Sequence, residues 1–388
     1  MALIRIHLKK NFGYLIVYFF AFLLRRIVCL IIKENFDINL THIYLYLMVL
    51  GEIMGGLLIY LYQYNSERKK KEIKYFGLDL IHNKNKAKDS KLKITFLIFF
   101  ASFFDIIDYA YANIYYPKIF SDCVDLRLSC IQTIASALIF IYTFKYKMKK
   151  HHKVSLIALG LCLLLTIIID AIFKKKYIPL KTFFFAYFIL IFNDFCFSIN
   201  NCIEKYLFDV DYMNPFKILI FEGLFGIIFS IFASISPNDR FRDLREKKIK
   251  ETGRLVLLIF LLFLYFLLSM IVNAYKVYAN IIFLPMARGL IEYILNPIFN
   301  IYFFVKKLDF NRNYCFFFLS EIICIFISFF GCVYNEYIIL SCFGLDKETD
   351  FEIEERAIST ENIPLVNMDD SSSNYEDDGR TASFNKDK

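Results

Sequence analysis

The sequence predicts an all-α integral membrane protein whose ten transmembrane helices form two inverted five-helix repeats. Of its 388 residues, 58% are hydrophobic and 19% are aromatic, which sets the chain apart from an ordinary soluble domain. Ten mostly apolar stretches run through the chain from Gly13 to Ser341. Each is long enough to cross a bilayer core of about 30 Å as a helix. These features argue against a soluble enzyme and predict a multi-pass membrane protein.

The ten predicted spans follow the apolar stretches in chain order. Arg25 and Arg26 interrupt the first stretch, and no small-residue cleavage site follows it. We therefore expect this stretch to stay as a helix rather than to be removed as a signal peptide. The spans are placed at residues 13–32, 42–62, 94–116, 126–144, 154–173, 180–203, 215–236, 255–275, 279–305 and 314–341.

Basic loops set the predicted orientation. The loop at 67–93 holds ten Lys and Arg residues, and the loop at 145–153 holds five Lys residues. Because basic loops usually stay in the cytosol, we expect both loops and the N-terminus there, and an even number of spans returns the C-terminus to the same side. The loop at 239–251 departs from this rule, since its six basic and four acidic residues would lie outside.

The span count also predicts how a duplicated half would insert. Five is an odd number, so a second five-helix unit must insert upside down relative to the first, as in inverted-repeat transporters. Spans four and nine share a spacing that supports a duplication. Arg127 opens an apolar run that ends at Lys145, and Arg288 opens a run of the same length that ends at Lys306.

The end of the chain differs in composition from the spans. It is acidic, polar and too poor in apolar residues to fold, so a disordered cytosolic tail is expected. Glu361 followed by Leu365 and Val366 resembles an acidic dileucine sorting signal, although tail composition alone also explains it. The predicted division of the chain is a first repeat at 1–173, a second repeat at 174–341 and the tail at 342–388.

Polar residues in span nine are the first candidates for a functional site. Arg288, Glu292, Asn296 and Asn300 recur every four residues and so share one face of a helix. Charges inside a membrane are costly and usually face a cavity or a partner, so this face is expected to line a central cavity. The alternative is an intrahelical Arg288–Glu292 ion pair that packs against a neighbouring helix.

Span three carries two carboxylates, Asp105 and Asp108, at positions that share one face of a helix. They could bind a proton or a cationic substrate. They could equally pair with Arg127, or with Arg25 and Arg26 of span one.

Spans two and six to eight hold further polar or small residues. Gly51, Gly55 and Gly56 are expected to let helices approach closely while Glu52 points into the bundle. The dense polar residues at the end of span six indicate a central or interfacial region, although Glu204 could simply cap the membrane exit of that span. Lys276, near the end of span eight, could extend to the membrane surface.

Cysteine and histidine spacing predicts neither a metal site nor a disulfide framework. The chain has ten Cys and five His but no pair of cysteines at the spacing of a metal-binding or redox motif. We interpret the cysteines as small core residues, and we expect no cofactor.

Three short motifs follow one another from span six into span seven. The chain reads Cys202-Ile-Glu-Lys-Tyr-Leu, then Asn214-Pro215-Phe, then Phe221-Glu222-Gly223-Leu224-Phe225-Gly226. This order resembles the central motifs of the F6-type branch of solute carrier family 35, in the EamA-like drug/metabolite transporter superfamily. Ile203 stands where a second acidic residue is usual, and Phe221 stands in place of Trp. The resemblance extends to Asp125-Leu-Arg127, to Arg288 and Glu292, and to Gly331-Cys-Val-Tyr-Asn335.

The resemblance implies ten helices in two inverted halves around a central substrate cavity. Nucleotide-sugar transporters belong to the same superfamily, and the F6-type branch is associated with lysosomal and other endomembranes. The expected function is therefore secondary transport of a small polar metabolite, such as a nucleotide sugar or another organic anion, across an endomembrane by alternating access. The Golgi, the lysosome and the vacuole are the candidate compartments.

Roles follow for the candidate residues. Arg127 and Arg288 would attract an anion from opposite sides of the cavity or exchange partners as gates. Glu292, Asn296 and Asn300 would line the cavity. Glu222 and Asp108 are the candidate proton or cation partners.

The main alternative is a non-transporting endomembrane scaffold that recruits partners through its basic loop and acidic tail. An enzyme is not expected, because no catalytic constellation is present. The candidate partners are a small-molecule substrate, the lipid bilayer, a second copy of the chain in a homodimer, and sorting machinery at the tail. Nucleic acid is not expected.

Overall fold

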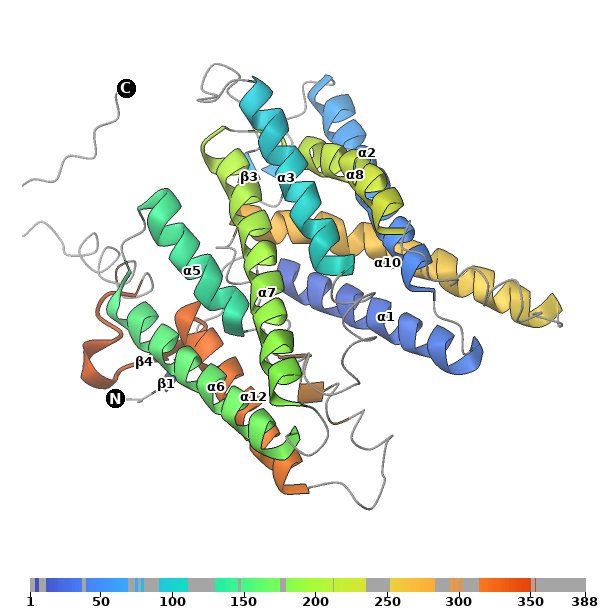
Figure 1. Cartoon of the computed structure of the whole chain (residues 1–388). Coiled ribbons are helices and arrows are strands. Elements are labelled where there is room, and N and C mark those ends of the chain that lie inside the picture. The colour runs from blue at the N-terminus through green and yellow to red at the C-terminus, as the bar shows by residue number, and fades with distance from the viewer. Residues whose placement is uncertain are drawn as a thin grey trace, which may run out of the picture.

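The computed structural model is an all-α bundle with two short β-ribbons (Figure 1). It describes residues 4–6, 12–36, 40–68, 74–75, 78–79, 91–110, 130–145, 148–174, 179–211, 213–234, 252–282, 294–295, 297–298, 301, 314–349 and 353. The long helices are α1 (Phe12–Phe36), α2 (Thr41–Arg68), α3 (Lys91–Ala110), α5 (Cys130–Phe144), α6 (Lys150–Lys174), α7 (Leu180–Asp209), α8 (Pro215–Ser234), α10 (Thr252–Ile282) and α12 (Tyr314–Tyr334). The short elements are β1 (Ile4–Ile6), β2 (Lys74–Tyr75), β3 (Leu78–Asp79), β4 (Ile338–Leu340) and the 3₁₀ turn η3 (Cys342–Gly344).

Helix α7 shows the distribution of polarity that defines this bundle. Its large side chains Phe184, Phe188 and Phe192 are exposed, whereas Asn200 and Glu204 are fully buried. A soluble helix would place these groups the other way round, because water solvates polar groups and disfavours apolar surface. The chain is therefore a multi-pass membrane protein with its polar groups inside.

Among the described residues, seven helices are long and apolar enough to cross a membrane: α1, α2, α6, α7, α8, α10 and α12. They correspond to predicted spans one, two, five, six, seven, eight and ten. Helices α3 and α5 lie at predicted spans three and four, where α3 carries several charged residues and α5 is described only from Cys130. Most of predicted span nine, at 279–305, lies outside the described residues.

The end of α12 differs from the prediction, which extended span ten to residue 341. The helix stops at Tyr334 because Glu336 adopts a left-handed conformation, with φ of 61°. The Tyr337 N–H donates to the Cys332 carbonyl and the Glu336 N–H to the Val333 carbonyl, which is the pattern of a Schellman C-cap. Burial raises the pKa of the Tyr337 phenol.

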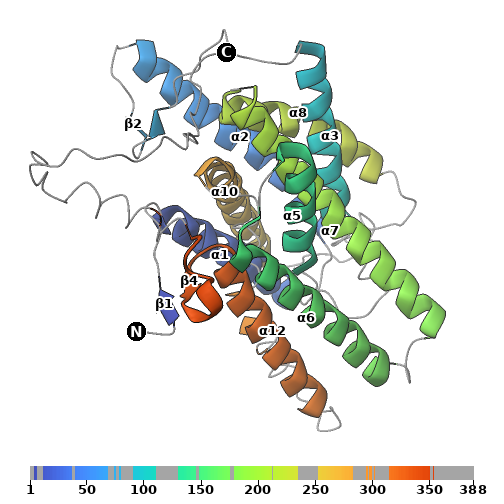
Figure 2. The same ribbon diagram turned by 90° about the vertical axis from the view of Figure 1, so that its left-hand side faces the viewer.

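The helices pack in a recurring pattern. Helix α10 lies between α1 and α2 (Figure 2), and α3 contacts both α7 and α8. Helix α2 packs along α8, and α6 packs along α12. Helix α7 joins the two sides of the bundle, since it contacts α3 on one side and α5 on the other.

Glycines allow the closest of these contacts, as predicted for span two. A Cβ atom on Gly55 would lie 3.0 Å from the Met270 carbonyl oxygen of α10. A Cβ atom on Gly56 would lie 2.9 Å from the Phe216 carbonyl oxygen of α8. In return, Gly223 of α8 packs against the backbone of α2. The prediction that these small residues serve helix packing is confirmed.

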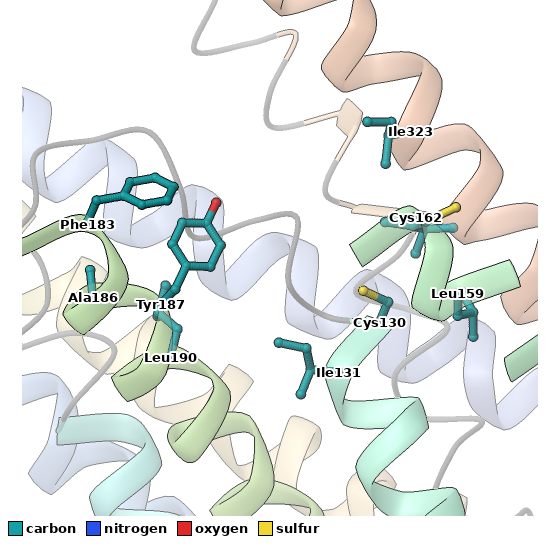
Figure 3. Close-up of a cluster of buried hydrophobic side chains, with 10 residues drawn as sticks. Cys130, Ile131, Leu159, Cys162, Phe183, Ala186, Tyr187, Leu190 and Ile323 are labelled. Atoms are coloured by element: carbon teal, nitrogen blue, oxygen red, sulfur yellow. The ribbon is translucent and has the colours of Figure 1, made fainter. Parts of the chain in front are cut away.

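A hydrophobic cluster joins α5, α6, α7 and α12. Figure 3 shows Tyr187 and Leu190 of α7 lying opposite Ile131 of α5, with Cys162 and Ile323 beyond. Cysteines contribute to this core, as expected from their positions in the apolar spans. The buried cysteines of the described residues are Cys130, Cys162, Cys196, Cys202 and Cys324.

A hydrogen bond at this cluster joins α7 to α6. The Tyr187 hydroxyl of α7 donates to Asp170 of α6, whose side chain is fully buried. We expect Tyr187→Phe to lower the free energy of unfolding by about 1–3 kcal/mol, because a buried carboxyl loses a donor. Thermal unfolding in detergent measures this. Tyr142→Phe is the control, since Tyr142 is 84% exposed, and an equal loss in both variants would contradict the assignment.

The first and last described strands meet in one antiparallel ribbon. In it Ile4 pairs with Leu340 and Ile6 with Ile338. Strand β1 precedes α1 and β4 follows α12, so both ends of the helical region lie at the same end of the bundle. Residues 342–349 continue as an ordered turn, in which Glu348 accepts a hydrogen bond from the Lys150 N–H of α6. The predicted tail is therefore structured in its first residues, and most of the rest lies outside the described residues.

Candidate functional site

Five helices bring charged side chains together inside the bundle. The contributing helices are α2, α3, α7, α8 and α10, and each supplies one group. Four of the five residues are at most 5% exposed, and the side chain of the fifth, Asp105, is 16% exposed. We name this group the polar centre, and it consists of Glu52, Asp105, Glu204, Glu222 and Lys276.

Lys276 is the cation at the heart of the polar centre. Its Nζ atom lies 3.1 Å from Asp105 Oδ1 and 2.9 Å from Glu204 Oε1. The residue is 2% exposed, so the expectation that Lys276 extends to the membrane surface is wrong. Helix α10 runs on to Ile282, which places Lys276 nearly two turns inside the helix rather than at its end. The ammonium instead links α3 to α7 through α10.

Two asparagines extend this linkage. Asn200 Nδ2 donates to Asp105 Oδ1 over 3.1 Å, and Asn280 Nδ2 donates to Glu204. Each amide group therefore donates one N–H to a carboxylate. Their Oδ1 atoms are buried and accept no hydrogen bond from the described residues. These two amide oxygens can therefore still accept a hydrogen bond.

Two further carboxyls complete the polar centre. Glu52 lies close enough to Asp105 to interact with it electrostatically. Glu222 lies close enough to interact electrostatically with Glu204 and Lys276, yet its Oε1 atom has no hydrogen-bond donor among the described residues. Four carboxyl groups thus share one ammonium, and the site favours protons, cations or hydrogen-bond donors.

Asp108 lies one turn beyond Asp105 and has a different partner. Asn193 Nδ2 donates to Asp108 Oδ1 over 2.6 Å, which joins α3 to α7. Gln132 of α5 donates in turn to Asp194 over 3.2 Å. Of the seven predicted site residues, the structure places Glu222 in the polar centre and Asp108 at the α3–α7 contact beside it.

The other five predicted site residues lie outside the described part of the chain. They are Arg127, Arg288, Glu292, Asn296 and Asn300. The proposed pairing of Asp105 with span one is replaced by its pairing with Lys276. Arg25 lies instead over the rings of Phe22 and Tyr265, at 5.2 and 6.0 Å from their centroids.

The sequence pattern predicted no chemistry for Lys276, and it left open whether Glu204 belongs to a central polar region or caps the membrane exit of span six. One signal would have found the lysine. Asn273, Lys276 and Asn280 are spaced by three and four positions, which puts three polar groups on one face of an otherwise apolar helix. All three are buried.

Two further hydrogen bonds lie beside the polar centre. Ser102 of α3 donates to the Glu222 carbonyl of α8 over 2.7 Å. Asn273 of α10 donates to the Met48 carbonyl of α2 over 3.2 Å. Ser102 lies three residues before Asp105, and Asn273 lies three residues before Lys276, the ion-pair partner of Asp105. Each half of the chain thus places a polar donor one turn before the charged residue of its helix.

Comparison with known proteins finds no family model that matches the chain and no curated protein similar to it. The resemblance to solute carrier family 35 therefore rests on the sequence motifs alone.

Proposed function

We propose that the chain is a secondary transporter that moves a small polar solute across an endomembrane by alternating access, with the polar centre as its binding site. The observation that carries this proposal is the burial of three carboxyls and Lys276, with the partly buried Asp105 beside them, between five helices of the bundle. A charge at the bilayer centre costs on the order of 3 kcal/mol, and charges retained there usually serve a solute or ion pathway.

The packing pattern supports two repeats related by a two-fold operation. In such an arrangement, span one corresponds to span six, span two to span seven, and so on. The contact of α1 with α10 then corresponds to that of α7 with α3, and the contact of α10 with α2 to that of α3 with α8. The pairs α2–α8 and α6–α12 map onto themselves. Asp105 and Lys276, which form an ion pair, then lie on corresponding helices, α3 and α10.

The β1–β4 ribbon supports an even number of spans. The described part of the chain has nine long helices, an odd number, although both ends of the helical region meet in one ribbon. A tenth crossing between α10 and α12 resolves this difference. Span nine is the crossing that the sequence predicts there, although its predicted start at residue 279 falls within α10.

The chemistry of the polar centre bears on the substrate class. The anion expectation rests on Arg127 and Arg288, whereas the described groups are mainly carboxyls and acceptor oxygens. Such a lining suits a solute that carries an amine or several hydroxyl donors, and it suits exchange of that solute for protons. Lys276 acts as an internal competitor, because a cationic solute can replace its ammonium between Asp105 and Glu204.

Alternating access gives the ion pairs a role in the cycle. Lys276 belongs to the second repeat, Asp105 to the first, and Glu204 to the second. Rocking of one half against the other stretches the Lys276–Asp105 contact while the Lys276–Glu204 contact stays within one half. A bound solute or proton at Asp105 then favours the separated state.

The test is uptake into liposomes that contain the purified chain, with a panel of amines, polyols, nucleotides and nucleotide sugars under an imposed pH gradient. We expect Glu222→Gln to lower uptake at least about tenfold, since it removes a titratable partner of the centre. Glu321→Gln of α12, a carboxyl outside the polar centre, is the matched control and should keep wild-type uptake. Uptake no greater than that of empty liposomes across the panel would favour the scaffold alternative instead.

A further inference from the structure

Two histidines and a glutamate meet at the end of the bundle that carries the β1–β4 ribbon. His151 and His152 lie in the first turn of α6, and Glu336 follows the end of α12. Each residue offers a ligand atom within 4.8 Å of the other two, and none is more than 3% exposed. We name these three residues the histidine site. It is separate from the polar centre in sequence and in helix membership, so it does not depend on the proposed transport function.

The contact between His151 and Glu336 is close but is not a hydrogen bond. His151 Nε2 lies 3.2 Å from Glu336 Oε1, yet neither ring nitrogen of His151 has a hydrogen-bond partner of adequate geometry among the described residues. A buried imidazole is therefore left unsatisfied. Two ligands of one tetrahedral zinc ion, with bonds of about 2.0–2.1 Å, lie about 3.3 Å apart with their lone pairs directed at the metal rather than at each other. The observed separation fits that arrangement.

The backbone at Glu336 gives a second reason to look for a ligand. Its φ of 61° places it at the C′ position of the α12 cap, where glycine is the usual residue. A side chain with a Cβ atom is disfavoured in this left-handed conformation. A glutamate held there aims a carboxylate at the histidines, and such outliers gather at functional sites.

The charged and titratable neighbours of the histidine site allow a metal. Lys149 Nζ lies 3.6 Å from Glu336 Oε1, but its side chain is 22% exposed and can withdraw toward solvent. His152 Nδ1 accepts a long hydrogen bond of 3.3 Å from the Lys149 N–H, which a metal bond at that nitrogen would replace. The ring of Tyr334 packs against His152 with centroids 4.8 Å apart and limits rotation of the imidazole.

We propose that His151, His152 and Glu336 bind a divalent transition metal of the Zn²⁺ type through one ring nitrogen of each histidine and the carboxylate. Two histidines and one carboxylate leave a fourth coordination position for water or another ligand. The metal would join the start of α6 to the end of α12, beside the ordered residues 342–349. Sequence spacing predicted no metal site, because its two halves come from distant segments.

The test is Zn²⁺ binding to the full-length chain, purified with a tag that lacks histidine and stripped with a chelator. Calorimetry gives the stoichiometry and affinity, and visible absorption of bound Co²⁺ reports tetrahedral coordination. We expect one ion per chain and at least about a tenfold loss of affinity in His151→Ala. Lys149→Ala should bind Zn²⁺ more tightly, because it removes a competing ammonium from Glu336.

Two further variants separate metal binding from folding. Glu336→Gly suits the left-handed backbone, so this variant should keep its thermal stability without metal while losing at least about tenfold in Zn²⁺ affinity. His42→Ala removes a histidine outside the site and should bind as the wild type does. The proposal is overturned if the folded wild-type chain binds no Zn²⁺, or if His151→Ala and Glu336→Gly bind as tightly as the wild type.

Discussion

Replacing Lys276 with methionine is expected to destabilise the folded chain by about 3–5 kcal/mol and to abolish transport. The substitution keeps the length and apolar stem of the side chain but removes the ammonium that lies within 3.1 Å of both Asp105 and Glu204. The remaining carboxylates would then be buried without a counter-charge. Chemical unfolding in mixed micelles measures the loss of stability, and liposome uptake measures the loss of transport.

A double variant distinguishes a lost ion pair from a lost packing contact. Glu204→Gln removes a charge that Lys276 neutralises, so Lys276→Met combined with Glu204→Gln should be less destabilised than Lys276→Met alone. If the two losses simply add, the ammonium and the carboxylate do not interact in the folded protein. A stable Lys276→Met variant would mean that the lysine reaches the membrane surface after all.

Replacing Gly56 with alanine is expected to lower stability by about 1–3 kcal/mol through a single added methyl group. The new Cβ atom would lie 2.9 Å from the Phe216 carbonyl oxygen and 3.0 Å from Ile220 Cγ1. The first of these is backbone, which cannot move aside without separating α8 from α2. Thermal unfolding in detergent measures the effect, and reduced uptake should follow because Glu52 and Glu222 lie on these two helices.

Gly160→Ala provides the matched control for this glycine. Gly160 lies in α6, and no atom of another described element lies within 4 Å of the position that an added methyl group would take. Alanine favours the helix over glycine by about 1 kcal/mol, and this variant should be as stable as the wild type or more so. Equal destabilisation of both variants would show that helix approach at Gly56 is not the cause.

The fold was predictable wherever a residue type favours a single structural role, such as an apolar stretch in a membrane helix or a glycine at a close helix contact. The apolar stretches predicted the membrane helices because a helix that crosses a lipid bilayer must be both long enough to span it and apolar. Gly55 and Gly56 predicted close helix approach, and Glu52 points into the bundle as expected. The predicted end of span ten was wrong because the helix stops at a left-handed residue that is a glutamate, Glu336. A glycine at this position would have indicated the helix end in the sequence.

The candidate site was predictable only in part, because sequence gives the helix face of a charge but not the partner that another helix brings to it. The sequence offered Asp105 either a proton or cation to bind or a basic residue to pair with, and its partner Lys276 comes from a helix in the other half of the chain. The histidine site poses the same difficulty, since His152 and Glu336 are distant in the chain and meet only through the packing of α6 against α12.

The β1–β4 ribbon has a consequence for the biosynthesis of the chain. Ile4 precedes every described helix in the chain, whereas its partner Leu340 follows α12 and is therefore synthesised later. At a synthesis rate of about 5–20 residues per second, the first strand waits roughly 15–70 seconds for the second. Ribbon closure therefore follows the synthesis of all the described helices that lie between the two strands.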